Sequence, residues 1–583
     1  YPAKGGDNST TDNLPEEKEI IQTYTRYAGQ MLHVPQLYQM NFPEMMEVLT
    51  EPEGCIYSKE RIAHLLYLLY ASCGRRLYDL DYVDHKGFGS LIGMEDNIRS
   101  SGMNKRIAKI AKMKIIDLFQ KKALSGRIRL INKKDLELAY TDTHVIEVWV
   151  NKFIPMARHG TKNKQVKAIN VHYLVGSDTG TPLAKEYSSG NKRLHWSIPH
   201  LVKMAEETLK ERGRKLGIIC FDKGGISLKT LKWLIKEGKG FLIWGKRAEY
   251  IKKQIRRLKD YRFRHRRKKE IRHDGKLMKV EERIADTTIH LKALGKVRTI
   301  VVELPDIEGG ERLWIHTNLS RRSYGPIEMR DMMRNKQRQE IFFKSRKNKT
   351  ALDCFAGGRC RVKPISRPSE KLLGLLKKHL KRLDRKIEKD QDNLCDVKEL
   401  REHGIYKPDL AKREMEYLNH RIIENIEQKE KTEEKIQWAE GGNRPQFIKQ
   451  RYELELEKQK LLNEFQDLAF LSKRETLKEF VSCYQKVLEK EALSPEEISQ
   501  RMKNLDKAAI EKELFSLGGV ITCDKREKRM TIMIVPQGRE YFRKALEIFL
   551  HQQNKKKVVI QYSSKEKYLL YFCLAPPLPI SAN

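Results

Sequence analysis

The chain has 583 residues and a formal net charge of +38, with 116 Lys and Arg against 78 Asp and Glu. Because domains usually hold about 100 to 200 residues, this length predicts roughly three to five domains. The basic excess indicates a polyanionic partner, although ribosome-associated and membrane-surface proteins share it. The most apolar stretches, Leu65 to Cys73 and Tyr568 to Leu574, are far shorter than the ~20 residues needed to span a membrane, which argues against a membrane protein.

The nine cysteines are scattered and contain no Cys-x-x-Cys pair, which indicates reduced thiols rather than a disulfide framework. Cys354 and Cys360 lie closest together. They have no histidine or second cysteine pair at ligand spacing, so the sequence does not favour a zinc site. No secretory signal is visible, and since the sequence begins at Tyr1 rather than at a methionine, it leaves room for a short upstream segment.

Residues 15–135 are expected to form a helical DNA-binding domain after a polar, disordered lead at residues 1–14. Apolar residues repeat at helical spacing over residues 59–76, which predicts a buried helix. Residues 93–113 predict two short helices broken at Gly102, and the second carries the basic residues Lys105, Arg106 and Lys109. This pair is either a helix-turn-helix that binds terminal DNA or a basic pair facing solvent, and the pattern favours neither.

Residues 136–246 alternate between strand and helix patterns, which predicts a mixed α/β sheet covered by helices. Three adjacent strands are predicted in LELAYTDTHVIEVWV, VKAINVHYLVG and PLAKEYS, and a helix follows at residues 198–212. Two further strands are predicted in LGIICFD, which ends on Asp222, and in GFLIWG, with a helix at residues 228–236 between them.

The rest of the chain is expected to interrupt this core and then extend it with helices. A very basic stretch, KKQIRRLKDYRFRHRRKKEIR, opens the interruption, and leucines repeat at three and four residues in the later helices. The expected divisions are a β-rich insertion at 247–320, a second part of the core at 321–363 with a long helix at 326–346, coiled-coil helices at 364–493, a small α/β unit at 494–574 and a Pro-rich tail at 575–583.

Three acidic residues stand in contexts typical of metal ligands. Asp142 lies inside a predicted strand, where an uncompensated carboxylate is costly to bury. Asp222 ends a strand just before a Gly-Gly turn, at the carboxyl edge where ligands of α/β sheets gather. Glu340 lies on the long predicted helix, and the residues on the same helical face are Met333, Lys336, Lys344 and Lys347. The three lysines are placed to hold DNA phosphates beside the carboxylate.

These carboxylates suit phosphodiester chemistry. Two divalent ions about 4 Å apart can serve both the attacking and the leaving oxygen, and three acids from separate elements can hold two Mg²⁺ or Mn²⁺ ions. Each acid alone is more often a turn, cap or surface residue, so their order and contexts carry the prediction. His144, two residues after Asp142, is at most an indirect neighbour of such a site and is left out of the catalytic set.

The segments FDKGGIS, WIHTNL and QEIFFKSRK resemble insertion-sequence transposases of the DDE type, in particular the IS-four family, over about residues 136 to 350. The family's helix signature is Tyr, two residues, Arg, three residues, Glu, six residues, Lys. Glu340 and Lys347 match it, whereas Met333 and Lys336 stand in the Tyr and Arg places. The resemblance implies an RNase H-like mixed sheet, with an Asp on the first and fourth strands and the Glu on a helix after a β-rich insertion.

The function implied by the resemblance is cut-and-paste DNA transposition, in which the ends of an element are cleaved and joined to target DNA. It implies Asp142, Asp222 and Glu340 as catalytic metal ligands, double-stranded DNA as partner, a homodimer on the paired ends and a prokaryotic, nucleoid-associated location without a membrane. Relatives insert an aromatic side chain of the insertion into the DNA end. Trp314 is the candidate here, although a strand tryptophan is more often a core residue.

Two other functions stay open. One is an RNase H-like, metal-dependent nuclease without strand transfer. The other is a non-catalytic DNA-binding protein, in which divalent metal has no role.

Overall fold

The structure is a computed structural model in which the chain forms two compact units. The first comprises Tyr1–Asn151, Pro155–Arg359 and Leu454–Asn583, and the second Lys152–Ile154 and Cys360–Glu453. The residues that the structure describes are 20–51, 57–112, 115–150, 154–159, 163–225, 227–245, 248–273, 276–291, 294–305, 312–336, 360–363, 369–404, 408–440, 451–454, 456–491 and 493–576. Among them, no helix is both long and apolar enough to cross a membrane. The expected lead at 1–14 lies outside these ranges.

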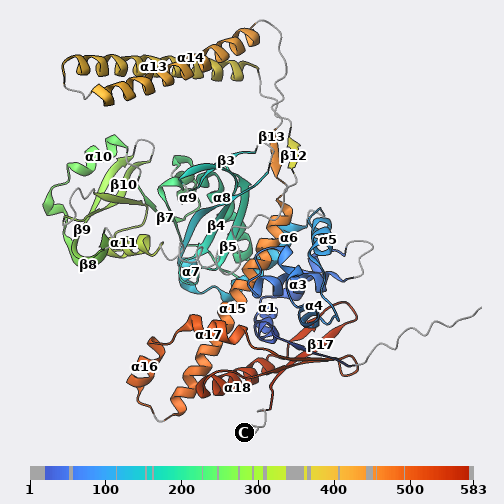
Figure 1. Cartoon of the computed structure of the whole chain (residues 1–583). Helices are drawn as coiled ribbons and strands as arrows, with labels where there is room; N and C mark the ends of the chain where they lie inside the picture. Colours follow the sequence, from blue (N-terminus) through green and yellow to red (C-terminus); the bar gives the residue numbers. More distant parts are fainter. Residues whose placement is uncertain are drawn as a thin grey trace, which may run out of the picture. The chain divides into compact units, whose positions relative to one another are not determined.

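Five strands of the first unit form a mixed sheet in the order β5-β4-β2-β6-β7 (Figure 1). Neighbours β5, β4 and β2 are antiparallel, whereas β2, β6 and β7 run parallel. β3 pairs antiparallel with the first residues of β4, on the edge away from β2. The bounds are β2 Leu138–Glu147, β3 Met156–His159, β4 Lys164–Gly176, β5 Pro182–Ser189, β6 Ile218–Phe221 and β7 Gly240–Trp244. The α/β alternation predicted from the sequence is therefore a mixed sheet.

Two helices, α8 (Leu194–Lys210) and α9 (Leu228–Lys236), pack on one face of this sheet. Their apolar side chains share a core with alternate residues of the strands, among them Ala139, Ile219, Phe221, Phe241 and Ile243. Because successive strand residues point to opposite faces, the residues between them face away from α8 and α9. That second face carries Tyr140, Asp142, Cys220 and, if the alternation continues past β6, Asp222.

The strands expected in the insertion extend the same sheet. β7 pairs antiparallel with β11, and β11, β10, β9 and β8 follow in antiparallel succession. Their bounds are β8 His265–His273, β9 Lys276–Leu291, β10 Gly295–Glu303 and β11 Leu313–Thr317, and the helical pieces beside them are α10 Glu249–Arg256, η6 Asp260–Arg262 and α11 Pro326–Asn335. α10 and the outer strands have a core of their own, which includes Ile251, Phe263 and Trp314.

The N-terminal helices and the C-terminal strands fold around one shared core. β1 pairs with β14, so that both ends of the chain contribute to a five-stranded sheet in the order β1-β14-β15-β17-β16. The N-terminal elements are β1 Ile20–Thr25, η1 Ala28–His33, α1 Val34–Gln39, α2 Phe42–Val48, α3 Lys59–Ala71, η2 Leu77–Asp81, α4 His85–Gly89, η3 Ser90–Ile92, α5 Ser100–Lys112, α6 Ile116–Arg127, η4 Ile128–Leu130 and α7 Lys133–Glu137. The C-terminal elements are α15 Glu457–Lys490, α16 Pro495–Lys503, α17 Lys507–Phe515, β14 Gly519–Asp524, β15 Arg529–Ile534, α18 Glu540–Lys555, β16 Val559–Gln561 and β17 Lys567–Leu574.

This shared core groups the chain differently from the divisions expected from the sequence. The sequence predicts separate domains at 15–135 and 494–574, yet the buried residues of both segments belong to one cluster. It also predicts that α15 belongs to the coiled-coil region 364–493, but the apolar residues of α15, including Leu461, Phe465 and Leu468, are buried in the same cluster. The grouping depends on contacts between segments that are far apart in the sequence. Local hydrophobic periodicity predicts single helices and strands but not such contacts.

The pair of short helices predicted at 93–113 is replaced by one longer helix. α5 runs from Ser100 to Lys112 and includes Gly102 near its start, so Gly102 does not break it. Isolated glycine weakens a helix by only about 1 kcal/mol relative to alanine, which the packing of Met103 and Ile107 in the core can offset.

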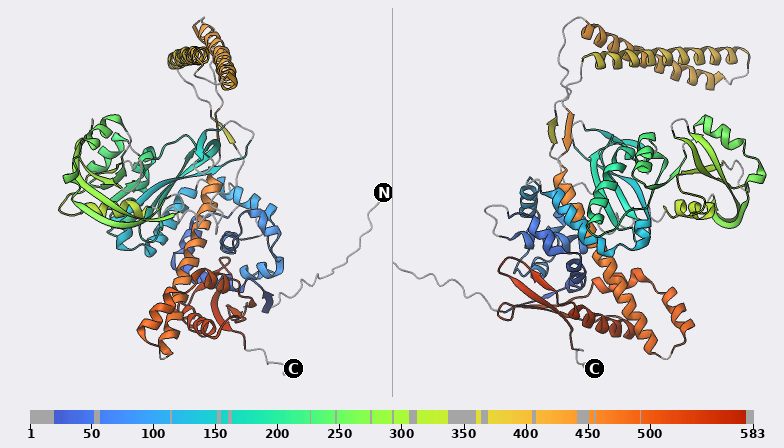
Figure 2. Two further views of the ribbon diagram at one scale, coloured as in Figure 1. Left: turned by 60° about the vertical axis from the view of Figure 1, so that its left-hand side comes forward. Right: turned by 180° about the vertical axis from the view of Figure 1, so that it is seen from behind.

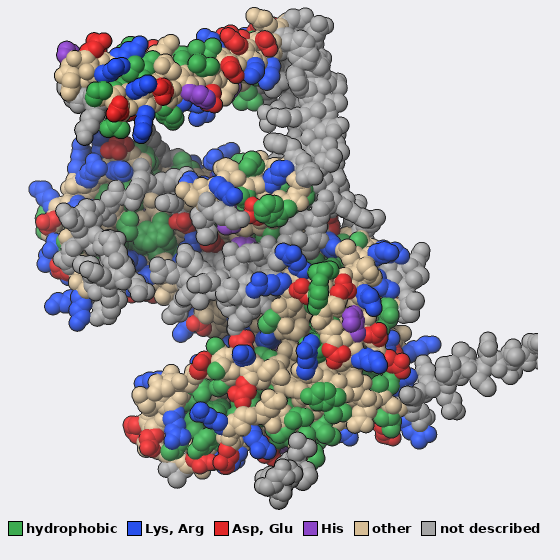
Figure 3. All heavy atoms as spheres, in the orientation of Figure 1, with side chains coloured by type: hydrophobic (Ala, Val, Ile, Leu, Met, Phe, Trp, Pro, Cys, Tyr) green, Lys and Arg blue, Asp and Glu red, His purple; other side chains and the backbone are tan. Residues whose placement is uncertain are grey.

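The second unit contains two long helices, α13 (Ser369–Glu402) and α14 (Pro408–Glu440), in antiparallel contact (Figure 2). Ion pairs at Asp390 with Arg421 and at Asp384 with Lys429 fix their register. Acidic and basic side chains are interspersed over the visible surface of this pair (Figure 3). β12 (Cys360–Lys363) pairs with β13 (Arg451–Leu454).

A fully buried ionic cluster joins α6, β5 and α15 in the first unit. Glu464 accepts from Arg127 and from Lys185 at 2.6 Å each, and Lys185 also reaches Asp467 at 2.5 Å. Burial by itself raises the pKa of the Glu464 carboxyl, but the charges of Arg127 and Lys185 outweigh it and lower that pKa to about 2. A lowered folded-state pKa stabilises the fold above the carboxyl's ordinary pKa, and this stabilisation is lost as the pH falls toward 2.

We expect Arg127→Ala to destabilise the first unit by about 3–5 kcal/mol, because it leaves buried carboxylates with one cation too few. The midpoint of thermal unfolding should fall at pH 7, and it should decline less than the wild-type midpoint over a scan of about pH 7 to 3, because without Arg127 the folded-state pKa of Glu464 lies less far below its unfolded-state pKa.

Arg129→Ala is the matched control, because the Arg129 side chain is exposed and donates only to the Gln39 carbonyl among the contacts described. Arg127→Met combined with Glu464→Met should recover much of the lost stability, since it removes the charge imbalance. Equal midpoints for Arg127→Ala and Arg129→Ala would contradict the role assigned to the cluster.

Candidate functional site

Pairing of β2 with β6 brings Asp142 and Asp222 side by side. The parallel register runs from Leu138 opposite Ile218 to Thr141 opposite Phe221. Asp142 and Asp222 are the residues that follow Thr141 and Phe221 in the sequence. Paired strands lie about 4.8 Å apart, and residues at equivalent positions project to the same face. The two carboxylates predicted from the sequence therefore come together at the end of β6, although 80 residues separate them in sequence.

The environment of Asp142 disfavours its charge. Burial raises the pKa of this carboxyl, and the nearby charge of Asp222 raises it further. Lys336 and a hydrogen bond from the Thr143 backbone N–H, at 2.8 Å to Oδ1, act in the opposite direction without cancelling the effect of burial. A bound cation would stabilise the charged forms of these two neighbouring, half-buried carboxyl groups.

Asp222 sits where the chain turns from β6 into α9. Its carbonyl accepts the N–H of Gly225 at 2.8 Å, which closes the turn. A Cβ at Gly225 would lie 2.6 Å from the Phe221 ring, so glycine lets the turn pack closely against β6. The Asp222 residue is half-buried at the carboxyl edge of the strand.

Helix α11 covers the face of the sheet on which the two acids lie. The Tyr140 hydroxyl donates to the Met332 carbonyl at 2.8 Å, and the Cys220 and Met333 sulfurs lie 3.1 Å apart. Met333, which stands in the Tyr place of the family signature, is buried by this packing. Lys336 follows at the end of α11, where its charge acts on both Asp142 and Cys220.

The remaining residues of the predicted helix, Glu340, Lys344 and Lys347, lie outside the described residues. Among the side chains that the structure describes, no group of three His, Cys, Asp or Glu residues is placed to hold a metal. The described part of the site is therefore the pair of carboxylates with Lys336.

Two histidines lie near the pair. His144 is buried on β2, and its charge is one of the smaller influences on Asp142. His172 on β4 is bound by the Thr143 hydroxyl at 2.8 Å and the Ser188 hydroxyl at 3.0 Å. Burial lowers the pKa of His172 to about 4, so this ring is neutral near pH 7. Its contacts are those of a structural residue.

Trp314 lies in the core of the outer strands. Only 6% of the residue is exposed, and its Nε1 lies so close to Gly245 that a Cβ there would be 1.8 Å away. With so little of the residue exposed, the ring offers no face on which a base could stack in this conformation. Exposed tryptophans occur elsewhere in the first unit, at Trp149 after β2 and at Trp196 in the first turn of α8, and no local sequence pattern marks either of them.

The predicted DNA-binding residues of α5 are partly exposed. Lys105 and Lys109 are exposed, whereas the Arg106 guanidinium stacks over the Tyr57 ring at 4.8 Å. The stacked Arg106 holds α5 against Tyr57, which lies just before α3. The two lysines remain candidates for phosphate contacts.

Comparisons with known proteins give little further information. No protein-family model matches the chain, and no curated protein matches its sequence. A solved structure to which it is similar is piggyBac transposase in a synaptic complex with hairpin DNA, with 12% sequence identity over 57% of this chain and 68% of that chain. The TM-score is 0.29, so the likeness is weak.

We expect Lys336→Ala to raise the pKa of the Asp142 carboxyl further, because it removes the cation that most favours the charged form. NMR of metal-free protein labelled with ¹³C at aspartate carboxyls measures the titration, and Asp142→Asn assigns the signal. Lys232→Ala, which removes an exposed lysine from α9, should leave the pKa unchanged. An unchanged pKa in Lys336→Ala would show that the lysine does not act on the pair.

Proposed function

We propose that this chain is a DNA transposase of the DDE type, in which Asp142, Asp222 and Glu340 hold two divalent metal ions. The observation that carries the proposal is the register of β2 and β6, which sets the first two acids next to each other on the sheet. The raised pKa of Asp142 adds to it, since carboxylates that resist ionisation without a cation are typical of functional sites.

We further propose that β5, β4, β2, β6 and β7 form an RNase H-like core. The family pattern has one Asp on the first strand and one on the fourth, and β2 and β6 are the first and fourth of these five strands along the chain. The strands β8 to β11 stand in the place of the β-rich insertion, between the second Asp and the Glu helix.

The donor set fits Mg²⁺ or Mn²⁺, which favour carboxylate oxygens and keep positions open for water and phosphate. When bound, a pair of such ions activates the attacking oxygen and stabilises the leaving oxygen of a phosphodiester. Asp142 and Asp222 hold the metals from the sheet, and Glu340 completes the set from the segment after α11. Lys336 offers a point charge to a DNA phosphate beside the two aspartates.

The net charge of +38 supports DNA as the partner, because each neutralised phosphate releases counterions and adds affinity. Cleavage of the transposon end would release a 3′ hydroxyl, which then attacks a phosphodiester of target DNA and displaces its 3′ oxygen. A homodimer on paired ends is part of the proposal.

We expect Asp142→Asn and Asp222→Asn each to lower Mg²⁺-dependent nicking of a supercoiled plasmid by about a hundredfold or more. Several kcal/mol of transition-state stabilisation are lost with a metal ligand, and each 1.4 kcal/mol corresponds to a factor of ten. DNA binding in EDTA should remain.

Asp178→Asn is the matched control, since Asp178 lies in the turn between β4 and β5 and binds Asn132 at 2.6 Å at the surface. Glu340→Gln should behave as the two core variants do. Near-normal nicking by Asp222→Asn would refute the assignment of the pair.

Joining distinguishes a transposase from a simple nuclease. DNA with pre-cleaved 3′ hydroxyl ends, taken from the borders of the element that carries the gene, should be inserted into a target plasmid by the wild type in Mg²⁺. Asp142→Asn should not insert it. Plasmid nicking without any insertion of pre-cleaved ends would instead support the nuclease function.

A further inference from the structure

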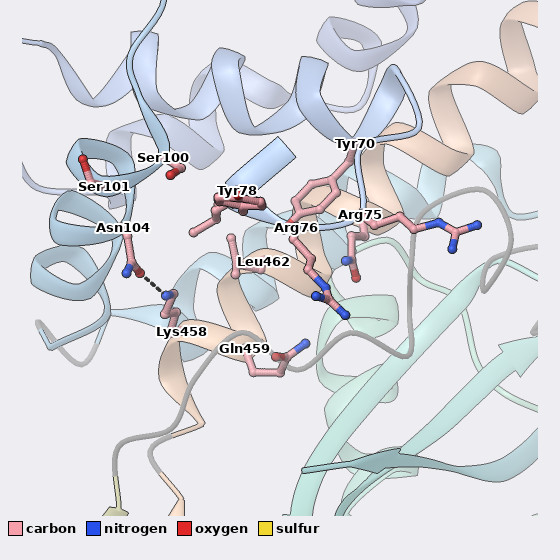
Figure 4. Close-up of a pocket in the computed structure, with 12 residues that line it drawn as sticks. Tyr70, Arg75, Arg76, Tyr78, Ser100, Ser101, Asn104, Lys458, Gln459 and Leu462 are labelled. Atoms are coloured by element: carbon pink, nitrogen blue, oxygen red, sulfur yellow. Dashed lines mark hydrogen bonds between the residues drawn. The ribbon is translucent and has the colours of Figure 1, made fainter. Parts of the chain in front are cut away.

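A recess of 320 Å³ lies between the start of α15 and the segment that leads from α3 to α5 (Figure 4). Its basic lining residues are Arg75, Arg76 and Lys458, and no Asp or Glu lines it. The rest of the lining is apolar, aromatic or neutral polar, and includes Tyr70 and Tyr78. The wall therefore suits an anion with an apolar part.

A second recess shows that this charge bias is not general. The 410 Å³ recess between α6, β5, α8 and α15 contains acids and bases together, for example Glu207 with Lys121. Both recesses border α15, yet the acidic side chains gather at only one of them. Where acidic and basic side chains line a recess together, their charges largely cancel. A recess whose charged lining residues are all basic attracts a phosphate.

The two arginines of the recess are held by their backbone. The N–H groups of Arg75 and Arg76 both donate to Asp79 Oδ2, at 2.5 and 2.9 Å. Both residues are exposed, and no hydrogen bond or ion pair to either guanidinium is present within the described part of the chain. The guanidiniums are thus placed on a fixed turn with their donors available for phosphate oxygens.

The opposite side of the recess is also fixed. Lys458 Nζ donates to Asn104 Oδ1, which ties α15 to α5. Gln459 and Leu462 are buried beneath it. This side of the recess is therefore held by the packing of α15 against α5.

Tyr78, which lines the recess, forms an exposed aromatic pair with Tyr82. Tyr78 is 57% exposed and Tyr82 is 67% exposed. Their rings meet nearly perpendicular with centroids 5.0 Å apart, and their hydroxyl groups are hydrogen bonded. Aromatic rings beside cations are the features on which proteins stack the bases of single-stranded nucleic acid.

We infer that this recess binds one unpaired nucleotide of single-stranded DNA, with its base against Tyr78 and its flanking phosphates on Arg75 and Arg76. A volume of 320 Å³ is at the small end of ligand sites and suits one base. The bases of a duplex are stacked inside the helix and cannot enter. The inference concerns binding alone and does not rest on the proposed metal chemistry.

The test is fluorescence anisotropy of the full chain with a labelled oligothymidylate of about ten nucleotides, in EDTA. Arg75→Ala combined with Arg76→Ala should weaken binding and lower the slope of log affinity against log salt by about 1.4, since each phosphate contact to a single strand contributes about 0.7. Tyr78→Ala should weaken binding about 5- to 150-fold, whereas Tyr78→Phe, which keeps the ring, should bind as the wild type.

Lys503→Ala combined with Lys507→Ala is the charge-matched control, because both lysines are exposed and lie outside the recess. It should leave the salt slope unchanged. A blunt duplex of the same length should be insensitive to Tyr78→Ala. The inference is overturned if the arginine and lysine double variants weaken binding equally, if Tyr78→Ala affects the duplex as much as the single strand, or if an oligoglutamate of equal charge displaces the oligothymidylate as well as unlabelled oligothymidylate does.

Discussion

The parallel pairing of β2 with β6 is the constraint on which the candidate site depends. It brings together two chain segments that are 80 residues apart and aligns Asp142 with Asp222. Strand alternation then sends both acids to the face that α8 and α9 leave open. α11 packs over that face through Tyr140 and Cys220, and so delivers Lys336 to the acids. Every other feature of the proposed chemistry is built on this alignment.

Two buried or half-buried acids, Glu464 and Asp142, differ in how well nearby cations compensate their charge. Glu464 is matched by Arg127 and Lys185, and its pKa falls to about 2 in spite of burial. Burial raises the pKa of the Asp142 carboxyl and the charge of Asp222 raises it further, while Lys336 opposes them only in part. In the cluster around Glu464 the cations balance the carboxylates, and the ion pairs join α6, β5 and α15. The pair of Asp142 and Asp222 leaves an excess of negative charge that a divalent cation would stabilise.

Local sequence patterns predicted the elements of the core but not their grouping. The end of the strand at LGIICFD could be predicted, because an apolar run and a Gly-Gly turn are both local sequence signals. The structure agrees, with β6 ending at Phe221, one residue before Asp222. Glu464 gave no such signal, since its partner Arg127 is 337 residues away and acids in a charged helix usually face solvent. The local pattern around Trp314 fits either base stacking or a core position, and the close approach of Gly245 to its ring places it in the core. The recess at Arg75 and Tyr78 is lined by three segments that are distant in the sequence, so no single stretch of sequence predicts it.

The central claim is that the aligned aspartates share a pair of divalent ions with Glu340. Anomalous diffraction from crystals of the protein grown with Mn²⁺ and DNA measures this directly. The account predicts two manganese peaks about 4 Å apart, with carboxylate oxygens of Asp142 and Asp222 as ligands and Glu340 beside them. Manganese bound elsewhere, with none at the ends of β2 and β6, would contradict it.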